Sequence, residues 1–350
     1  MSKILPVIFL VAFSVSLSGQ IGGRSVFTFL NTPNSARAAG MGGYLITSPA
    51  TDISLALDNP ALITDDLDGQ LSFQHQFLQS GIQSGYAGIG KNFPSRKIMA
   101  HAGVKYILYG TFDQTDEFGN ITGSFKGSEL ALQVGTSYLL YDKMRIGANL
   151  KFIQSSLEVY NSSGLAVDLG AFYQDTASGF GAALVIKQAG LQLTAFDEVR
   201  ESLPLDIQLG LSKKLTHLPF RFFITWHHLN RWNLLYDDPN TEEDTFFGGL
   251  QPLRKEPTQA DNFFRHMIFG GEMVLGKKES FKIRLGYNHQ LKQELSVLTL
   301  RSFAGFSFGF GVKVKKFQFD YSNSVLHFGG SSHHIGLSTN LRYFTGNGIL

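Results

Sequence analysis

Residues 129–140 read ELALQVGTSYLL, and this stretch alternates between two kinds of side chain. Leu130, Leu132 and Val134 fall on one face of an extended chain, and the positions between them carry small or polar residues. Successive residues of a β-strand point to opposite faces, so the pattern predicts a strand with one apolar and one polar surface. The apolar face is a core in a soluble β-sandwich, whereas in a membrane barrel it faces lipid and the polar face lines the lumen.

Similar segments recur along the chain from about residue 70, and they predict fourteen strands. The expected ranges are 70–78, 83–91, 97–108, 129–140, 144–154, 165–174, 179–188, 204–214, 219–229, 263–275, 280–290, 302–312, 315–323 and 334–344. Many are about ten residues long, which is the length that a tilted strand needs to cross a membrane. An even number of strands is the rule for single-chain bacterial barrels.

The connections between these strands alternate in length. Short turns are expected around 92–96, 141–143, 175–178, 215–218, 276–279 and 313–314, and longer loops at 109–128, 155–164, 189–203, 230–262, 291–301 and 324–333. Outer-membrane barrels have short periplasmic turns and longer extracellular loops, whereas a sandwich has no reason to sort its loops in this way. The sequence therefore predicts an all-β fold, a 14-stranded antiparallel transmembrane β-barrel in a bacterial outer membrane, with both termini in the periplasm.

The first 19 residues have the features of an export signal. Lys3 is followed by an apolar run over 4–17 that is too short to span a membrane, and small residues follow it. We expect 1–19 to be a signal peptide; the alternative is a buried N-terminal helix. The chain has no cysteine, which excludes disulfides, thiolate metal sites and a cysteine nucleophile.

Composition supports a membrane barrel. Charged residues make up 17% of the chain, below the roughly 25% of soluble domains, and aromatic residues make up 13%. Aromatic residues suit strands and membrane-interface girdles. The net charge of +2 gives no indication of a nucleic-acid partner. Basic residues gather near the short turns, where they could meet lipid head groups or simply be solvated.

Residues 20–69 lack strand alternation and are rich in small residues and turn formers. Small side chains allow dense packing in a narrow space, and Asn59-Pro60 is a turn signal. We therefore expect 20–69 to be an N-terminal hatch, or plug, inside a barrel formed by 70–350. The alternative is a periplasmic tail with no fixed place.

The sequence offers no convincing catalytic or metal-binding constellation. Ser307 lies in a G-x-S-x-G match, but the match falls inside an alternating run with no helix after it, so we expect a strand residue. The pairs His227-His228 and His333-His334 should point to opposite faces of their strands and therefore not chelate one ion. We expect no enzyme, no cofactor and no metal.

The longest expected loop, 230–262, is rich in aromatic residues. Aromatic side chains often anchor protein interfaces, so Trp232, Tyr236, Phe246 and Phe247 are candidate contacts for a protein partner. The alternative is an interfacial aromatic girdle.

Two blocks before the first strand carry a family resemblance. Gly22, Gly23, Ser25, Phe27, Phe29 and Leu30 precede SARAA at 35–39, and DISLALDNPAL follows at 52–62. The segment resembles the hatch of FadL-like outer-membrane proteins and, more closely, the PorQ family of the type IX secretion system. The hatch residues that the resemblance marks are Arg37, Ala38, Ala39, Gly40, Gly42, Gly43, Asp52, Asn59, Pro60 and Ala61.

The resemblance implies a non-enzymatic component of the attachment complex that matures secreted cargo and joins it to lipopolysaccharide. Such a protein anchors a PorZ-like surface protein at the outer membrane, alongside a PorU-like sortase and a PorV-like shuttle barrel. The alternative is a FadL-like channel for hydrophobic small molecules. A barrel enzyme is a third possibility, which the absence of a catalytic constellation disfavours.

Overall fold

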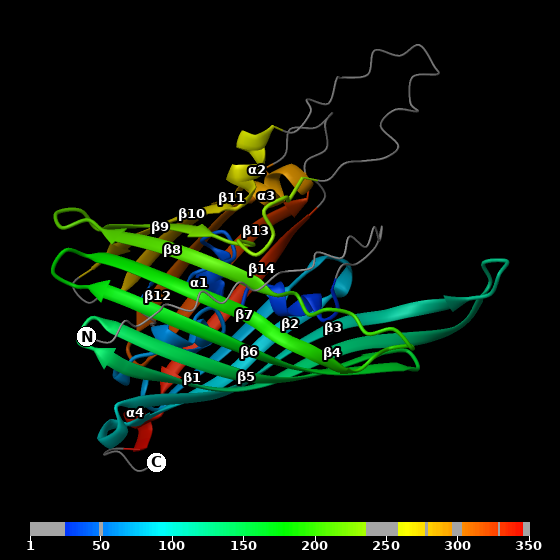
Figure 1. The fold of residues 1–350 in the computed structure, drawn as a ribbon, viewed down its shortest axis with the longest axis horizontal. Helices are drawn as coiled ribbons and strands as arrows, with labels where there is room; N and C mark the ends of the chain where they lie inside the picture. Colours follow the sequence, from blue (N-terminus) through cyan, green and yellow to red (C-terminus); the bar gives the residue numbers. More distant parts are fainter. Residues whose placement is uncertain are drawn as a thin grey trace, which may run out of the picture.

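Fourteen antiparallel strands form a closed barrel in which β1 pairs with β14 and every other strand pairs with its neighbours along the chain (Figure 1). The structure, a computed structural model, describes residues 25–48, 52–235, 258–276, 279–295, 303–327 and 330–345. The predicted fold class is therefore confirmed. The predicted signal peptide lies outside the described residues.

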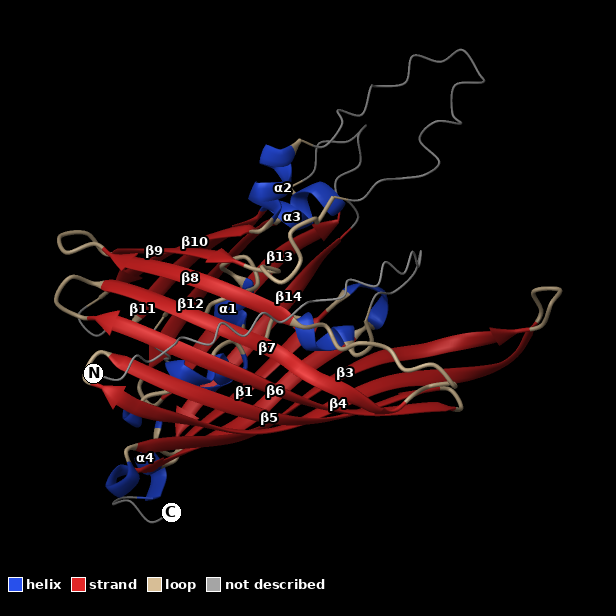
Figure 2. Ribbon diagram, in the orientation of Figure 1, coloured by secondary structure: helices blue, strands red, loops and turns tan. Residues whose placement is uncertain are grey.

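Strands make up most of the described chain (Figure 2). They are β1 (Gln70–Phe77), β2 (Gln83–Phe93), β3 (Ile98–Thr115), β4 (Ile121–Tyr141), β5 (Met144–Leu157), β6 (Tyr160–Asp175), β7 (Phe180–Thr194), β8 (Asp206–Lys214), β9 (Phe220–Trp226), β10 (Met267–Leu275), β11 (Phe281–Asn288), β12 (Phe306–Val314), β13 (Phe317–His327) and β14 (Gly330–Asn340). The α-helices are α1 (Ala36–Ala39), α2 (Gln259–Arg265), α3 (His289–Glu294) and α4 (Arg342–Thr345). Six 3-10 turns complete the set: η1 (Thr28–Asn31), η2 (Ile53–Leu57), η3 (Pro60–Leu62), η4 (Asp65–Leu67), η5 (Gln79–Gly81) and η6 (Pro94–Arg96). Among the described residues, no helix is long and apolar enough to cross a membrane.

The alternating residues of β4 form an apolar outer face and an inner face of small and polar residues, as the sequence predicted. Leu130, Leu132 and Val134 are exposed on the outer surface of the barrel, and Ala131 and Gln133 are buried inside it. A large apolar surface of this kind is stable when lipid covers it.

Two of the predicted long loops, 109–128 and 155–164, are largely strand, and the first six residues of a third, 189–203, also belong to a strand. The β3–β4 ladder continues outward to the pair Thr115↔Ile121, so 109–128 forms a long hairpin rather than a loop (Figure 2). β5 and β6 pair as far as Leu157↔Tyr160, and β7 extends to Thr194. Alternation predicts a strand only where its two faces meet different surroundings; beyond the membrane both faces are solvated, so the pattern disappears although the ladder persists.

Four predicted strand ends were wrong because other local structures form there. Residues 263–265 belong to α2, whose first turn is capped by the side chain of Thr258, which accepts a hydrogen bond from the amide of Asp261. Residues 289–290 begin α3, which is capped in the same way by Asn288. β9 ends at Trp226, and β14 ends at Asn340 before α4. Side-chain caps of this kind compete with continuation of a strand.

Residues 25–48 and 52–68, called the N-terminal segment below, lie inside the barrel (Figure 1). α1 packs against β12, β13 and β14, and η3 packs against β4, β5 and β6. The main apolar cluster joins segment residues such as Ile53 and Leu62 to inward-facing Met99, Phe172 and Phe223. The core of this protein is therefore the contact between the N-terminal segment and the inner wall of the barrel.

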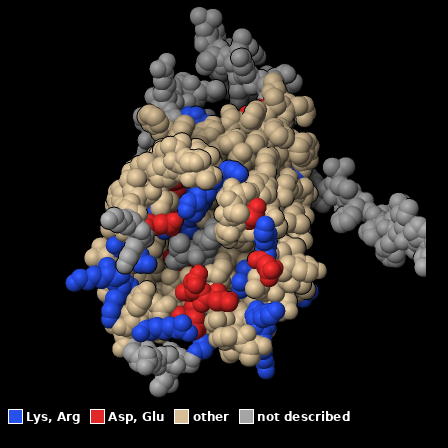
Figure 3. Space-filling view, turned by 90° about the vertical axis from the view of Figure 1, so that its left-hand side faces the viewer, with Lys and Arg blue, Asp and Glu red and all other residues tan. Residues whose placement is uncertain are grey.

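The two ends of the barrel differ. Turns at 94–97, 142–143, 176–179, 215–219 and 315–316 lie at one end, the short-turn end, where β1 begins and β14 finishes. The other end, the long-loop end, carries the β3–β4 hairpin and α2 and α3 (Figure 1). Basic side chains gather around the short-turn end (Figure 3), where Lys143 pairs with Asp175 and Arg145 with Asp65.

Candidate functional site: the seat of the N-terminal segment

Arg37 connects α1 to the barrel wall. Ser35 begins the helix, and its side chain accepts a hydrogen bond from the amide of Ala38. The Arg37 guanidinium then reaches Glu272 of β10 with Nε 3.0 Å from Oε1 and Nη2 2.8 Å from Oε2. Both side chains are buried, and paired contacts of this kind are the strongest form of an arginine–carboxylate interaction.

Glu272 is the centre of a wider charged network inside the barrel. Arg284 of β11 donates to Oε1 at 3.1 Å, and Arg221 of β9 donates to Oε2 at 3.2 Å. Arg284 also lies 2.6 Å from Asp320 of β13. One carboxylate therefore balances several guanidinium groups, and the segment is tied through it to β9, β10, β11 and β13.

Asp58 and Lys105 are prominent in a second group of contacts, which holds the middle of the segment. Asp58 accepts a hydrogen bond from Asn34 at 2.9 Å and lies 3.7 Å from the ammonium group of Lys187. Lys105 donates to the carbonyl oxygens of Leu30 and Thr32 at 3.2 and 2.8 Å. Barrel charges thus satisfy backbone groups that the short turns of the segment leave unpaired.

The Asp-to-Ala part of the hatch motif forms local turns. Asp52 accepts a hydrogen bond from the amide of Ser54 and another, at 2.7 Å, from Gln74 of β1. Asn59 accepts from the amide of Ala61 and donates to the carbonyl of Ile46, both at 2.9 Å. Pro60 follows as the first residue of η3, where its missing N–H costs no hydrogen bond.

The glycines of the motif let the backbone approach the wall closely. Gly42 and Gly43 have φ values of 94° and 106°, which favour glycine. The amide of Gly42 donates to the hydroxyl of Ser307 at 2.9 Å. Opposite it, a Cβ on Gly286 would lie 2.2 Å from the nitrogen of Gly42. Ala38 and Ala39 are buried, and Gly40 packs against the wall at Gly309.

Ser307 occupies the strand position that the sequence predicted. It lies in β12 between Phe306 and Phe308, both exposed on the outer surface, and its own side chain faces inward. Its hydroxyl accepts the hydrogen bond from Gly42, so the G-x-S-x-G match marks a contact with the N-terminal segment.

A cavity of about 310 Å³ lies between the N-terminal segment and the long-loop end of the strands. Pro33, Tyr44, Leu78 and Leu291 give it apolar walls, and histidines, amides, hydroxyl groups and the carboxylate of Glu294 add polar points. Pockets of this composition bind small molecules whose orientation a few polar groups fix.

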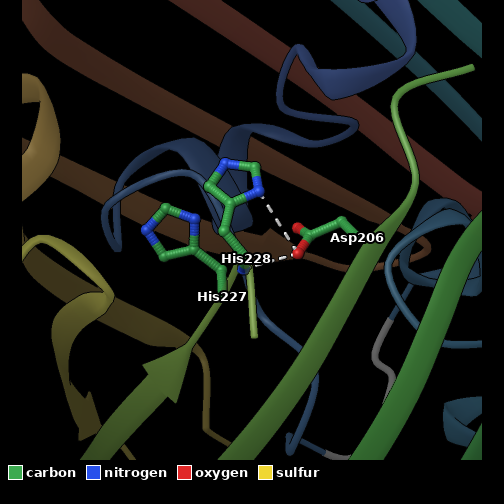
Figure 4. A group of neighbouring side chains, drawn as sticks. All are labelled: Asp206, His227 and His228. Carbon is green, nitrogen blue, oxygen red and sulfur yellow. Dashed lines mark hydrogen bonds and ion pairs between the residues drawn. The ribbon is translucent and has the colours of Figure 1, made fainter. Parts of the chain in front are cut away.

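The prediction that His227 and His228 point to opposite faces was wrong. β9 ends at Trp226, and His228 has a φ of 55°, so the strand geometry on which the prediction rested has already stopped. The ring centroids lie 4.5 Å apart, beside the carboxylate of Asp206 (Figure 4).

The other histidine pair behaves as the sequence indicated. His333 and His334 lie within β14, where the first is exposed and the second is buried. Of the candidate partner contacts, Trp232 is exposed and stacks on His266 with centroids 5.0 Å apart. Tyr236, Phe246 and Phe247 lie outside the described residues.

The charged residues on the barrel side of this site were not identified from the sequence. Glu272, Arg284, Asp320, Lys105 and Lys187 all lie in strands and point into the lumen. A charge at a polar-face position of a predicted strand was the available signal, because buried charges in proteins need partners.

Comparisons with known proteins support the fold. No family model matches the sequence, and no curated protein matches it. Among solved structures, the toluene transporter TbuX of Ralstonia pickettii has 11% identity and a TM-score of 0.51, over 89% of this chain and 99% of that one. A FadL homologue of Pseudomonas aeruginosa has 10% identity and a TM-score of 0.46, over 87% and 97%. At such identity the likeness to TbuX concerns the fold alone: the closed barrel of this chain is similar in fold to that transporter.

Proposed function

We propose that the barrel takes up hydrophobic small molecules across the outer membrane, and that the N-terminal segment closes the lumen between passages. The cavity of about 310 Å³ carries this proposal. An apolar cavity of about 150 Å³ is enough to bind benzene in an engineered protein, so a monoaromatic compound or part of an acyl chain fits here. The likeness in fold to a toluene transporter supports the same class of ligand.

The position of the cavity fits a first binding site. It opens between the long-loop ends of β9 and β11 to β14 and the glycine turn at Gly42 and Gly43. A molecule bound there lies directly on the segment that blocks the lumen. Onward passage then requires the segment to shift, and its polar contacts can exchange protein partners for water as it does so.

Filling the cavity with a larger side chain is expected to slow the uptake of hydrophobic compounds strongly. The Ser324→Trp variant places a large ring among the lining residues, because the side chain of Ser324 faces inward and its hydroxyl donates to the carbonyl of Ala39. We expect the initial rate of uptake of labelled toluene or oleate into cells to fall at least about tenfold, which corresponds to about 1.4 kcal/mol of lost binding. Phe319→Trp is the matched control, because Phe319 lies on the same strand and faces outward. Unchanged uptake by the Ser324→Trp barrel would count against this function.

A second candidate is the anchor role in type IX secretion, which the two sequence blocks favour. Residues 35–39 and 52–62 are buried parts of the N-terminal segment. The charged network that holds Arg37 against the barrel wall suits a barrel that stays closed. We propose that such a barrel anchors a PorZ-like surface protein, with a PorU-like sortase, a PorV-like shuttle barrel and lipopolysaccharide nearby. The β3–β4 hairpin offers further contacts, since Phe112 stacks on Phe125 and Phe118 is 88% exposed.

Shortening the long-loop end tests the anchor role. Replacing 234–258, or separately 112–125, by a few Gly and Ser residues should leave the barrel folded, because the membrane-spanning ladder lies elsewhere. We expect a surface protein that copurifies with the parent barrel to appear in the medium instead. If all surface proteins stay membrane-bound in both variants while uptake of hydrophobic compounds is normal, the anchor role is excluded and the transport role stands.

A further inference from the structure

A cluster of three side chains, Asp206, His227 and His228, lies at the long-loop ends of β8 and β9. The last pair of the β8–β9 ladder is Leu209↔Trp226. Beyond it the backbone N–H of His228 donates to Oδ1 of Asp206 at 2.6 Å, and the N–H of Leu229 donates to the carbonyl of Ile207 at 3.1 Å. These bonds bring Asp206, His227 and His228 together where the regular pairing has ended.

The candidate ligand atoms of the three side chains lie near one another. A carboxylate oxygen of Asp206 and one ring nitrogen from each histidine all lie within 4.8 Å of one another. Figure 4 shows the two imidazole rings next to each other, with the carboxylate turned toward the ring of His228. Nδ1 of His228 is 3.4 Å from Oδ1 of Asp206.

His227 is the member of the cluster whose buried ring nitrogens lack clear hydrogen bonds. Its side chain is 1% exposed, yet neither ring nitrogen makes a well-formed hydrogen bond among the described residues, where the backbone of Arg265 is the neighbouring polar group. Tyr44 of the N-terminal segment stacks on the ring, with centroids 5.4 Å apart, which fixes the ring plane without pairing either nitrogen. A buried polar group without a partner is costly, so the arrangement calls for a ligand.

We propose that Asp206, His227 and His228 bind a divalent cation of the zinc type. Two imidazole nitrogens and one carboxylate oxygen are a known set of three protein ligands for Zn²⁺ that leaves the fourth position open. Zinc binds such atoms at about 2.0–2.2 Å, so the three side chains would close around the ion from their present spacing of up to 4.8 Å. His227 and His228 also line the cavity, so the open position has room for water.

His266 is the nearest alternative ligand, and its contacts exclude it. Its two ring nitrogens lie 2.8 and 3.0 Å from the carbonyl oxygens of His227 and Trp232. Both ring nitrogens of His266 therefore face backbone carbonyl oxygens and not the cluster. The site thus holds three protein ligands, two of them from consecutive residues.

A bound cation would crosslink the long-loop ends of β8 and β9. β9 has seven residues and pairs with β8 only over Leu209–Lys214, which makes this the shortest ladder in the described barrel. Joining Asp206 to both histidines would hold the two strands together beyond that ladder, beside Tyr44 of the segment. This role is independent of whether the barrel transports molecules or anchors a protein.

Titration of the metal-free barrel with ZnCl₂ alone tests the proposal. The protein should carry no polyhistidine tag, be purified in detergent without residues 1–19, and be treated with a chelator that is then removed. We expect one saturable Zn²⁺ site by calorimetry and a higher temperature for the conversion of the folded, fast-migrating gel band. X-ray absorption at the zinc edge should show two imidazoles among nitrogen and oxygen ligands.

Substitutions then assign the site. His227→Gln and His228→Gln should each weaken Zn²⁺ binding by more than about tenfold, which is the scale even of supporting contacts in metal sites. Asp206→Asn provides a further variant that keeps the side-chain shape. His333→Gln is the control, since His333 is exposed on β14. The proposal is overturned if no saturable site is found, or if folded His228→Gln or Asp206→Asn binds Zn²⁺ as the parent does.

Discussion

The Glu272→Gln barrel is expected to lose much of its stability and to release the N-terminal segment. Glutamine keeps the shape of the side chain but removes the negative charge that Arg37, Arg284 and Arg221 share. Removing one partner from a buried ion pair costs about 3–5 kcal/mol, because the remaining charges stay buried without compensation. Heat modification on gels should occur at a lower temperature, and trypsin should cut within residues 25–48 of the folded barrel.

Glu279→Gln is the matched control for that experiment. Glu279 pairs with Lys214 at 3.4 Å in an exposed turn, and exposed pairs contribute about 0–1 kcal/mol. Its gel behaviour and protease pattern should match those of the parent. If Glu272→Gln behaves like Glu279→Gln, the charged network does not hold the segment.

The Gly286→Val barrel is expected to form without its segment correctly seated. A Cβ at this position would lie 2.2 Å from the nitrogen of Gly42 and 2.3 Å from the carbonyl carbon of Met41, and these backbone atoms cannot move independently of the segment. Overpacking costs about 1–3 kcal/mol where a core can adjust, and backbone contacts this short leave displacement of the segment as the relief. Cleavage by trypsin after Arg37, the basic residue that precedes the glycine turn, should rise.

Gly271 supplies the control for this change. It lies in the neighbouring strand β10, and a Cβ there meets nothing within 4 Å. Gly271→Val should leave the protease pattern and the conductance unchanged. Equal protection of the segment in both variants would mean that Gly286 does not form part of its seat.

The strands could be predicted because a membrane wall gives each one two different surroundings. Leu130 and Gln133 already show this in the sequence, and the structure places them on opposite faces. Outside the membrane the same ladder continues through Asp113 and Gln114, where both faces meet water and no pattern forms. Hydrophobic alternation therefore located the strands well and their outer ends poorly.

Of the two halves of the site, only the N-terminal segment could be predicted from the sequence, and its partners on the barrel wall could not. Small residues and turn formers indicated that 20–69 packs densely, and the family resemblance marked Arg37 as a hatch residue. Its partner Glu272 lies 235 positions away. That pairing depends on the register of a closed barrel, which no local pattern encodes. The histidine pair failed as a prediction for a related reason, since the left-handed φ of His228 follows from where β9 ends.

The central claim is that the N-terminal segment closes the lumen of a membrane barrel, and conductance in planar bilayers tests it most directly. Two proteins should be compared after gels confirm that both are folded: the barrel from residue 20 onward, and the same barrel lacking 25–62. The account predicts small or no conductance for the first and large, steady channels for the second, since a fourteen-stranded wall without its filling leaves an open lumen. A deletion variant that is as closed as the intact barrel would contradict the account.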